Sequence, residues 1–242
     1  MLSAIYITII IYFFLGALGF YAINRKKSKE EALRNWTKYI SYFVIINGVF
    51  FSITLNQLYF RYLTIIIILI AAYELFNLFI KSEYKSPYFF GGSAIVLIIV
   101  SISFYRFSYL EKGTILFTFL VLSIFDSFSQ ITGQLFGRKK IIPTISPNKT
   151  LGGLIGGTAI ALIGSILLNK VYSKPVLDCV LMAIGIISSA FIGDIAASYY
   201  KRKYKVKDFS NLIPGHGGVL DRFDSLIAGG AFVHLIYSLI YF

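Results

Sequence analysis

Residues 62–80 read YLTIIIILIAAYELFNLFI, an apolar run whose single charged residue is Glu74. An α-helix rises about 1.5 Å per residue, so about 20 such residues cross a hydrocarbon core of roughly 30 Å. Runs of this kind recur along the whole chain, in which 57% of residues are hydrophobic and 14% are charged. Soluble domains carry about 25% charged residues, and a water-soluble core cannot absorb this much apolar surface. The sequence therefore predicts an all-α, polytopic helical bundle in a membrane.

The apolar runs predict about eight membrane spans joined by short polar connections. Their expected bounds are 3–24, 39–55, 62–80, 88–105, 114–136, 151–168, 176–198 and 219–241. No internal repeat or low-complexity tract stands out, so residues 1–242 are interpreted as one transmembrane domain. The one cysteine, Cys179, lies inside an apolar run, which excludes an internal disulfide and a cysteine metal cluster.

Lysine and arginine are unevenly distributed over the connections. The connections after spans one, three, five and seven hold six, two, four and six of the 23, with Arg222 counted in the last, and the opposite connections hold five. Basic residues gather in the cytoplasmic loops of membrane proteins, so the first set is expected in the cytoplasm and both termini outside. This topology signal accounts for the net charge of +12 without a nucleic-acid partner.

Four aspartates lie within spans or at their ends. Asp126 is well inside the fifth span, Asp194 is near the cytoplasmic end of the seventh, and Asp221 and Asp224 open the eighth at a spacing that stacks them on one face. The helix face of Asp126 also holds Gln130, Gly133, Gln134 and Gly137. A carboxylate at the bilayer centre costs roughly 2.5–3.5 kcal/mol on the insertion scale, so each needs a partner, a water-filled cavity or a function.

Two interpretations of these carboxylates follow from the residues alone. Each aspartate could pair with a neighbouring Lys or Arg, and Arg222 is close to the last two. Alternatively, carboxylates mixed with Lys, Arg and His suit a magnesium–polyphosphate site, in which oxygen ligands bind the hard cation and basic groups hold the remaining phosphate oxygens. Glu74 is open to the same two interpretations, with Lys81 as a structural partner.

The stretch from 193 to 224 contains closely spaced polar motifs that no amphipathic period explains. It holds GDIAAS (193–198), KR (201–202), KD (207–208), Ser210, PGHGG (214–218) and DRFD (221–224). Pro214 and the glycines around His216 predict a turn whose backbone N–H groups approach a ligand, directly before a helix start that favours anions. These motifs at these intervals resemble the signature of the phosphatidate cytidylyltransferases, the CDP-diacylglycerol synthase family.

A second block is similar to another segment of that family. It comprises residues 126–137, Pro143, ISPNKT (145–150) and Gly153, and the AAYEL stretch around Glu74 is a fainter match. The chain departs from the family pattern at Tyr200, where an aliphatic residue or Phe is usual, and at Gly152, where a glutamate is usual. The glycines between 152 and 157 also suit close packing of helices.

The resemblance implies that CTP and phosphatidic acid react to give CDP-diacylglycerol and pyrophosphate, with Mg²⁺, one ion or two, as cofactor. The implied metal ligands are Asp126, Asp194, Asp221 and Asp224. The implied catalytic residues are Asp194, Asp221, Asp224, His216, Lys207 and Asp208. The implied substrate-binding residues are Lys149, Ser146, Ser198, Lys201, Arg202 and Arg222.

Other functions remain as alternatives. A CTP-dependent lipid kinase, acting on a polyprenol or phytol, would share the architecture and the nucleotide, and Gly152 leaves room for a non-catalytic or altered-substrate relative. The oligomeric state is open, with a homodimer as one option. The abundance of Ile, Lys, Tyr and Phe favours a bacterial source, so the expected location is the bacterial inner membrane with the site facing the cytoplasm.

Overall fold

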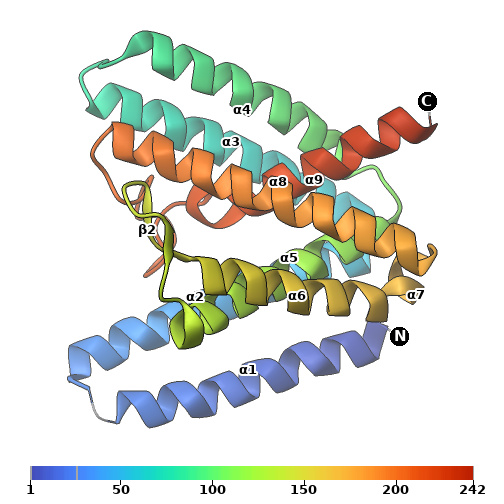
Figure 1. The fold of residues 1–242 in the computed structure, drawn as a ribbon. Coiled ribbons are helices and arrows are strands. Elements are labelled where there is room, and N and C mark those ends of the chain that lie inside the picture. Colours follow the sequence, from blue (N-terminus) through green and yellow to red (C-terminus); the bar gives the residue numbers. More distant parts are fainter. Residues whose placement is uncertain (1, 26, 242) are drawn as a thin grey trace.

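The computed structural model describes residues 2–25 and 27–241, which form nine helices and a two-stranded sheet (Figure 1). The helices are α1 (Leu2–Asn24), α2 (Lys29–Leu55), α3 (Gln57–Lys81), α4 (Pro87–Phe107), α5 (Lys112–Phe136), α6 (Leu151–Leu167), α7 (Asn169–Tyr172), α8 (Val176–Lys203) and α9 (Leu220–Tyr241). The strands are β1 (Lys140–Ile142) and β2 (Ser146–Thr150). The predicted all-α, polytopic membrane architecture is confirmed.

Six helices in the described part of the chain are long and apolar enough to cross a bilayer, namely α2, α3, α4, α5, α8 and α9. Two further apolar stretches, Leu2–Leu18 in α1 and Leu151–Leu167 in α6, are shorter. Each of the eight expected spans coincides with one of these helices. The number of crossings, about eight, stays a prediction.

The helices differ from the expected spans where they continue into polar sequence. α2 begins at Lys29, well before residue 39, because the Ser28 side chain accepts a hydrogen bond from the Glu31 amide (3.3 Å) and Glu30 and Glu31 lie in the first turn. α8 continues to Lys203. Hydropathy marks the apolar part of a helix and misses such extensions. The antiparallel hairpin of β1 and β2 was not expected from the sequence.

The connections sort into two groups at opposite ends of the bundle. Figure 1 shows the α1–α2 and α3–α4 connections, the β hairpin and the α8–α9 loop at one end, whereas both chain ends lie at the other. These are the connections after the first, third, fifth and seventh predicted spans. Their basic residues therefore share one end of the molecule with the two polar motif blocks; of these residues, Lys26 lies outside the described ranges.

The core is centred on α5. Residues 114–122 of this helix are buried without interruption, because α5 packs against α2, α6, α8 and α9. Further along, Asp126, Gln130 and Gln134 are exposed. The helix thus leaves the core at Asp126 and carries a polar face toward the end that holds the hairpin.

Glycines bring α5 and α6 into close contact. A Cβ added at Gly157 would lie 2.0 Å from Ser129 Oγ and 2.9 Å from its amide nitrogen, and one at Gly153 would lie 2.7 Å from the Ser129 carbonyl oxygen. Gly133 faces Thr150 and Gly153 in this contact, and so belongs to the helix interface as well as to the polar face expected for Asp126. The packing role expected for the glycines of α6 is present.

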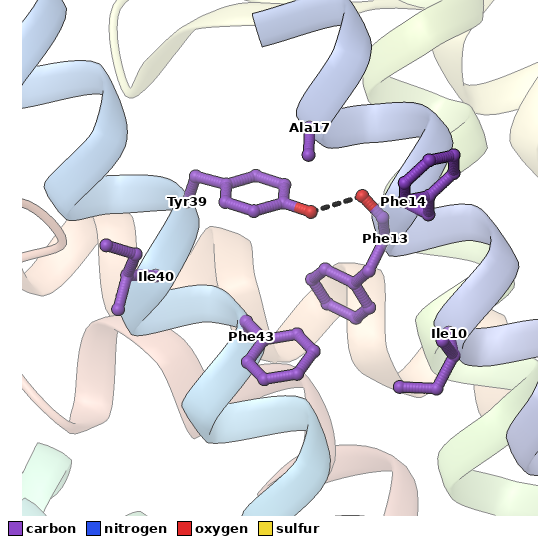
Figure 2. A pocket seen from close by; sticks show the side chains of 7 residues that line it. All are labelled: Ile10, Phe13, Phe14, Ala17, Tyr39, Ile40 and Phe43. Carbon is purple, nitrogen blue, oxygen red and sulfur yellow. Dashed lines mark hydrogen bonds between the residues drawn. The ribbon is translucent and has the colours of Figure 1, made fainter. Parts of the chain in front are cut away.

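A pocket between α1 and α2 has no residue of the two polar motif blocks in its lining (Figure 2). It is lined by Ile10, Phe13, Phe14, Ala17, Tyr39, Ile40 and Phe43. The Tyr39 hydroxyl donates a hydrogen bond to the Phe13 carbonyl oxygen across it. Its lining carries no charge, so it cannot neutralise a polyphosphate.

Candidate active site

The segment between α8 and α9 forms a tight turn around His216. The Ile213 amide donates to the Gly217 carbonyl (2.8 Å), and the His216 amide donates to the Ile213 carbonyl (2.9 Å). Gly215 and Gly217 have φ angles of +77° and +89°, in the left-handed region that glycine adopts without strain. A Cβ at Gly217 would lie 2.9 Å from a carboxylate oxygen of Asp221, so the turn closes against the start of α9.

Asp221 is enclosed by partners from the chain itself. Its Oδ1 accepts a hydrogen bond from Lys201 Nζ (2.5 Å), and its Oδ2 accepts from the amides of Phe209 and Gly218 (2.8 Å each). The Asp221 side chain is 1% exposed. Through these hydrogen bonds, the Asp221 carboxylate connects α9 to α8 and to the turn segment, residues 204–219 between the two helices. The expected roles of Asp221 as a metal ligand and of Lys201 in substrate binding stay predictions.

Glu74 of α3 is enclosed by the same segment. The Ser210 hydroxyl donates to its Oε1 (2.6 Å), and the amides of Val219 and Leu220 donate to its two oxygens (2.9 and 2.7 Å). Its partners are thus the turn segment and the start of α9. The amides at the start of α9 were expected to favour a bound anion. Instead, the amide of Gly218 donates to Asp221 and those of Val219 and Leu220 donate to Glu74, so carboxylates of the chain itself take this place.

Tyr200, one departure from the family pattern, anchors α8 to α3 next to Glu74. Its side chain is buried, and its hydroxyl donates to the Leu75 carbonyl (2.8 Å). Its ring stacks on Phe209 with centroids 5.8 Å apart. The hydroxyl therefore has a structural partner, as a buried tyrosine requires.

Three other aspartates face one another from three helices. Asp126 of α5, Asp194 of α8 and Asp224 of α9 lie within electrostatic range of each other. Asp126 is exposed, and Asp194 and Asp224 are partly exposed, in contrast to Asp221. Lys149 pairs with Asp194, and both Lys149 and Arg222 act on the charge of Asp126. The arrangement is a group of accessible carboxylates with two cations at its edge.

The hairpin brings Lys149 to this group. Lys149 lies on β2, and its Nζ is 4.5 Å from the ring centroid of Phe191 on α8 while it pairs with Asp194. The Ser198 hydroxyl donates to Asp194 Oδ1 (3.3 Å), one turn further along α8. Lys149 and Ser198, both expected near substrate, thus hold one of the carboxylates.

The other predicted residues lie in the hairpin, at the end of α8 and in the α8–α9 segment, at the same end of the bundle. Arg202 donates to the carbonyls of Ile145 (3.1 Å) and Val206 (2.8 Å), which ties the hairpin to the α8–α9 segment. Ser146 opens β2 beside this tie, and Lys207 is exposed in the segment. Asp208 packs against Gly217, where an added Cβ would lie 3.0 Å from Asp208 Cβ.

The tip of the turn rests on α2. The Ser41 hydroxyl donates to the Pro214 carbonyl (2.9 Å), and the Tyr42 and His216 rings stack with centroids 6.4 Å apart. A Cβ at Gly215 would lie 2.9 Å from Lys38 Cγ. Burial, together with the positive charges of Arg222 and Lys38, lowers the pKa of His216 below its usual range, so the imidazole is neutral at pH 7.

The contacts from α2 were not expected from the sequence. Ser41 and Tyr42 lie three and four residues after Lys38, which places all three on one helix face, and their only signal is polarity at the start of an apolar span. Glu74 gave a stronger signal, since it is a carboxylate inside a span. Its partners could not be found without the fold.

The accessible carboxylates fit a hard divalent cation in the chemistry of their donor atoms. Magnesium takes oxygen ligands and keeps several waters, so carboxylates that reach accessible space from three helices suit it. As they lie, no group of three or more His, Cys, Asp or Glu side chains in residues 2–25 and 27–241 encloses a metal position. Binding of a metal ion would thus require these side chains to move, and the positive charges of Lys149 and Arg222 now act on them.

The fold and this site define a polytopic membrane protein with clustered carboxylates and cations at one end of its bundle. Residues 88–240 match the model of the cytidylyltransferase family. The chain is 40% identical to the phosphatidate cytidylyltransferase of Bacillus subtilis (strain 168) over 116 residues, which are 47% of this chain and 43% of that protein. It is 43% identical to that of Staphylococcus saprophyticus over 115 residues, which are 47% and 44% of the two chains.

A longer match extends over most of both chains. The phosphatidate cytidylyltransferase of Rickettsia bellii (strain RML369-C) is 30% identical over 226 residues, which are 88% of this chain and 98% of that protein. The chain spans under half the length of the Bacillus and Staphylococcus relatives. The chain belongs to the cytidylyltransferase family.

Proposed function

We propose that this protein transfers a cytidylyl group from CTP to phosphatidic acid, giving CDP-diacylglycerol and pyrophosphate. The observation that carries the proposal is the group formed by Asp126, Asp194 and Asp224 with Lys149 and Arg222 at one end of a membrane bundle. A lipid phosphate lies at headgroup depth and CTP comes from water, so a site at this end meets both. The names of the relatives support the same substrates.

The reaction joins two anions. An oxygen of the lipid phosphate attacks the α-phosphorus of CTP, a new P–O bond forms, and the bond to the β-phosphate oxygen breaks as pyrophosphate leaves with the electron pair. No nucleophile from the protein is required, so positioning and charge neutralisation supply the catalysis. A site with cations beside metal-binding carboxylates is suited to neutralising and positioning two anions.

Asp126, Asp194 and Asp224 are the residues that would hold Mg²⁺. When bound, Mg²⁺ would supply positive charge that neutralises the phosphate oxygens during the transfer. The chain adds Lys149 and Arg222, whose charges face the same group. Lys207, exposed in the turn segment, would meet the outer phosphates of the triphosphate.

His216 would act on a proton or as a hydrogen-bond donor. Its imidazole is neutral at pH 7 and lies within electrostatic range of Arg222, so it can accept a proton from a lipid phosphate or donate to a phosphate oxygen. Asp221, Lys201 and Arg202 would support this site through the contacts described above, which leave their polar groups engaged within the chain.

The site is proposed to face the cytoplasm of a bacterial inner membrane. Support comes from the end of the bundle that carries both the site and most of the basic residues, since such residues stay on the cytoplasmic side. CTP is a cytoplasmic nucleotide, so this orientation places the site where the nucleotide is.

The test is product analysis with purified protein in mixed micelles containing phosphatidic acid, CTP and Mg²⁺. We expect equal amounts of pyrophosphate and CDP-lipid, no product after the metal is removed with EDTA, and recovery when Mg²⁺ is added back. Asp224→Asn tests the site, and Glu111→Gln, an exposed carboxylate at the start of α5, is the matched control.

Each contrary result has a definite meaning. CDP together with a phosphorylated alcohol, when a polyprenol or phytol is supplied, would identify a lipid kinase. Absence of any product, with an active relative run alongside and lipid and detergent varied, would refute transfer to phosphatidic acid. Full activity of Asp224→Asn would remove Asp224 from the metal site.

A further inference from the structure

Glu74 is a fully buried carboxylate in the last third of the membrane-spanning helix α3. Its side chain is among the largest with no exposure in the described residues, and a buried ionised group is costly unless it is compensated. The compensation consists of three short hydrogen bonds, from the hydroxyl of Ser210 and the amides of Val219 and Leu220. All three donors belong to the segment that carries the turn around His216.

These hydrogen bonds fasten both ends of the turn segment to one side chain. Ser210 precedes the Pro214–Gly218 motif and Val219 and Leu220 follow it, so the Glu74 carboxylate closes the base of the loop. The last two donors are orphan amides at the start of α9, where a negative charge also interacts favourably with the helix dipole. Glu74 therefore fixes the point at which α9 begins.

The tip of the same loop is held separately by α2, through Ser41 at Pro214 and Tyr42 at His216. Both holding helices lie outside residues 88–240, which match the family model. The loop is thus fixed at its base by α3 and at its tip by α2. The contacts at the tip include His216 itself, whereas the three donors at the base, Ser210, Val219 and Leu220, have no role that the resemblance implies.

The site depends on where α9 begins. Arg222 lies in the first turn of α9 and Asp224 directly after that turn, just beyond the amides that Glu74 binds, and His216 lies inside the loop that Glu74 closes. A shift of about 1 Å in reacting groups can cost about a hundredfold in rate. Release of the base of the loop would displace the histidine on one side and the α9 residues on the other.

We propose that Glu74 is a positioning residue that holds the His216 loop and the start of α9 in the geometry required for turnover. In so far as it concerns turnover, the inference rests on the proposed function. Glu74 acts through His216, Arg222 and Asp224 and does not itself touch substrate. Its carboxylate is specifically suited, because it offers acceptors to all three donors at once.

Glutamine is the informative replacement. Glu74→Gln keeps size and shape, and its Oε1 can still accept from Ser210 and Val219. Its amide group, however, places a donor opposite the Leu220 N–H, which leaves that amide without an acceptor. Glu83→Gln is the matched control, since Glu83 follows the same helix, is exposed and undergoes the same change of charge.

Two readouts separate positioning from general folding. Amide hydrogen exchange of residues 209–220 reports on the loop directly and is independent of any substrate. The turnover number per folded molecule, with the thermal midpoint of the bundle, reports on the site. We expect Glu74→Gln to speed exchange in 209–220 but not in α5, to keep the midpoint near that of Glu83→Gln, and to lower kcat about ten- to a hundredfold.

Exchange in 209–220 that matches the wild type, or faster exchange with an unchanged kcat, would overturn the proposal. Where Glu74→Gln does not fold, Ser210→Ala replaces it, because this variant removes one donor and leaves the carboxylate. Ser210→Ala is expected to change both readouts in the same direction, and wild-type values for both would overturn the proposal. A wild-type protein that makes no CDP-lipid refutes the proposed function, whereas the exchange data still decide whether Glu74 holds the loop.

Discussion

Lys201 and Asp221 form a buried ion pair in which Nζ and Oδ1 are 2.5 Å apart and the side chains are 10% and 1% exposed. The same carboxylate accepts two backbone amides, from Phe209 and Gly218. Removal of one partner of a buried pair leaves an uncompensated charge, which is more costly than the pair is stabilising. The pair is therefore expected to act on stability first.

Lys201→Met tests this expectation. The variant should lower the free energy of unfolding by about 3–5 kcal/mol, because the Asp221 charge stays buried without its cation. Reversible unfolding in mixed detergent micelles measures the change. Lys203→Met, at an exposed position two residues further along α8, is the control and should cost little. Equal stability of the two variants, with turnover lost only in Lys201→Met, would instead make Lys201 a substrate ligand.

Asp224→Asn, unlike Lys201→Met, should lower activity without lowering stability. Asp224 faces Asp194 and Asp126, so loss of its charge relieves repulsion among three carboxylates. We expect a thermal midpoint equal to or above that of the wild type in metal-free buffer, with product formation lowered by about a hundredfold or more. Asp221→Asn should instead lower the midpoint. A large loss of stability in Asp224→Asn would contradict the division between an accessible group and a buried scaffold.

The architecture could be predicted from the sequence because a bilayer restricts the structures that an apolar segment can form. Apolar runs of helix length can only be spans or buried helices, and the sidedness of Lys and Arg sorted the connections into the two groups that the fold shows. The sequence was also sufficient for the accessible carboxylates, since Asp126, Asp194 and Asp224 were singled out by position within apolar spans.

Which polar residues are buried in contacts within the chain, and which are accessible, could not be predicted from the sequence. Asp221 and Asp224 lie on one face of the same helix, yet one is enclosed by amides and a lysine whereas the other faces like charges. This difference is set by the α8–α9 segment, whose path depends on Glu74 and on α2. Such contacts join residues far apart in the chain, and local spacing carries no information about them.

Gly152 lies where a side chain meets backbone. A Cβ there would be 2.8 Å from the Phe136 carbonyl oxygen and 3.3 Å from Gly137 Cα, so α6 would have to move away from the end of α5. We expect Gly152→Ala to cost about 1–3 kcal/mol, as overpacking does. Gly91→Ala in α4 is the matched control, because nothing lies within 4 Å of a Cβ at that position.

The same geometry bears on the glutamate that the family pattern has at this position. Gly152→Glu should be less stable than the wild type and should not raise turnover, since its side chain requires the helices to separate. Unfolding measurements with both substitutions, and turnover with Gly152→Glu, provide the test. A stable and more active Gly152→Glu protein would mean that the α5–α6 contact adapts and that the chain lacks a useful carboxylate.

His216 makes stability depend on pH in a defined direction. Its pKa is lowered by burial and by Arg222 and Lys38, so in mildly acidic solution the unfolded chain binds a proton that the folded chain excludes. This contribution to stability is complete above the unfolded pKa of about 6.5 and is lost as the pH falls through the folded pKa. A protonated imidazole would face two cations, on α9 and α2, and would loosen the turn.

His216→Asn removes the titrating group, so its thermal midpoint should fall less than that of the wild type below about pH 6.5. Parallel curves for the two proteins would show that the turn tolerates the charge.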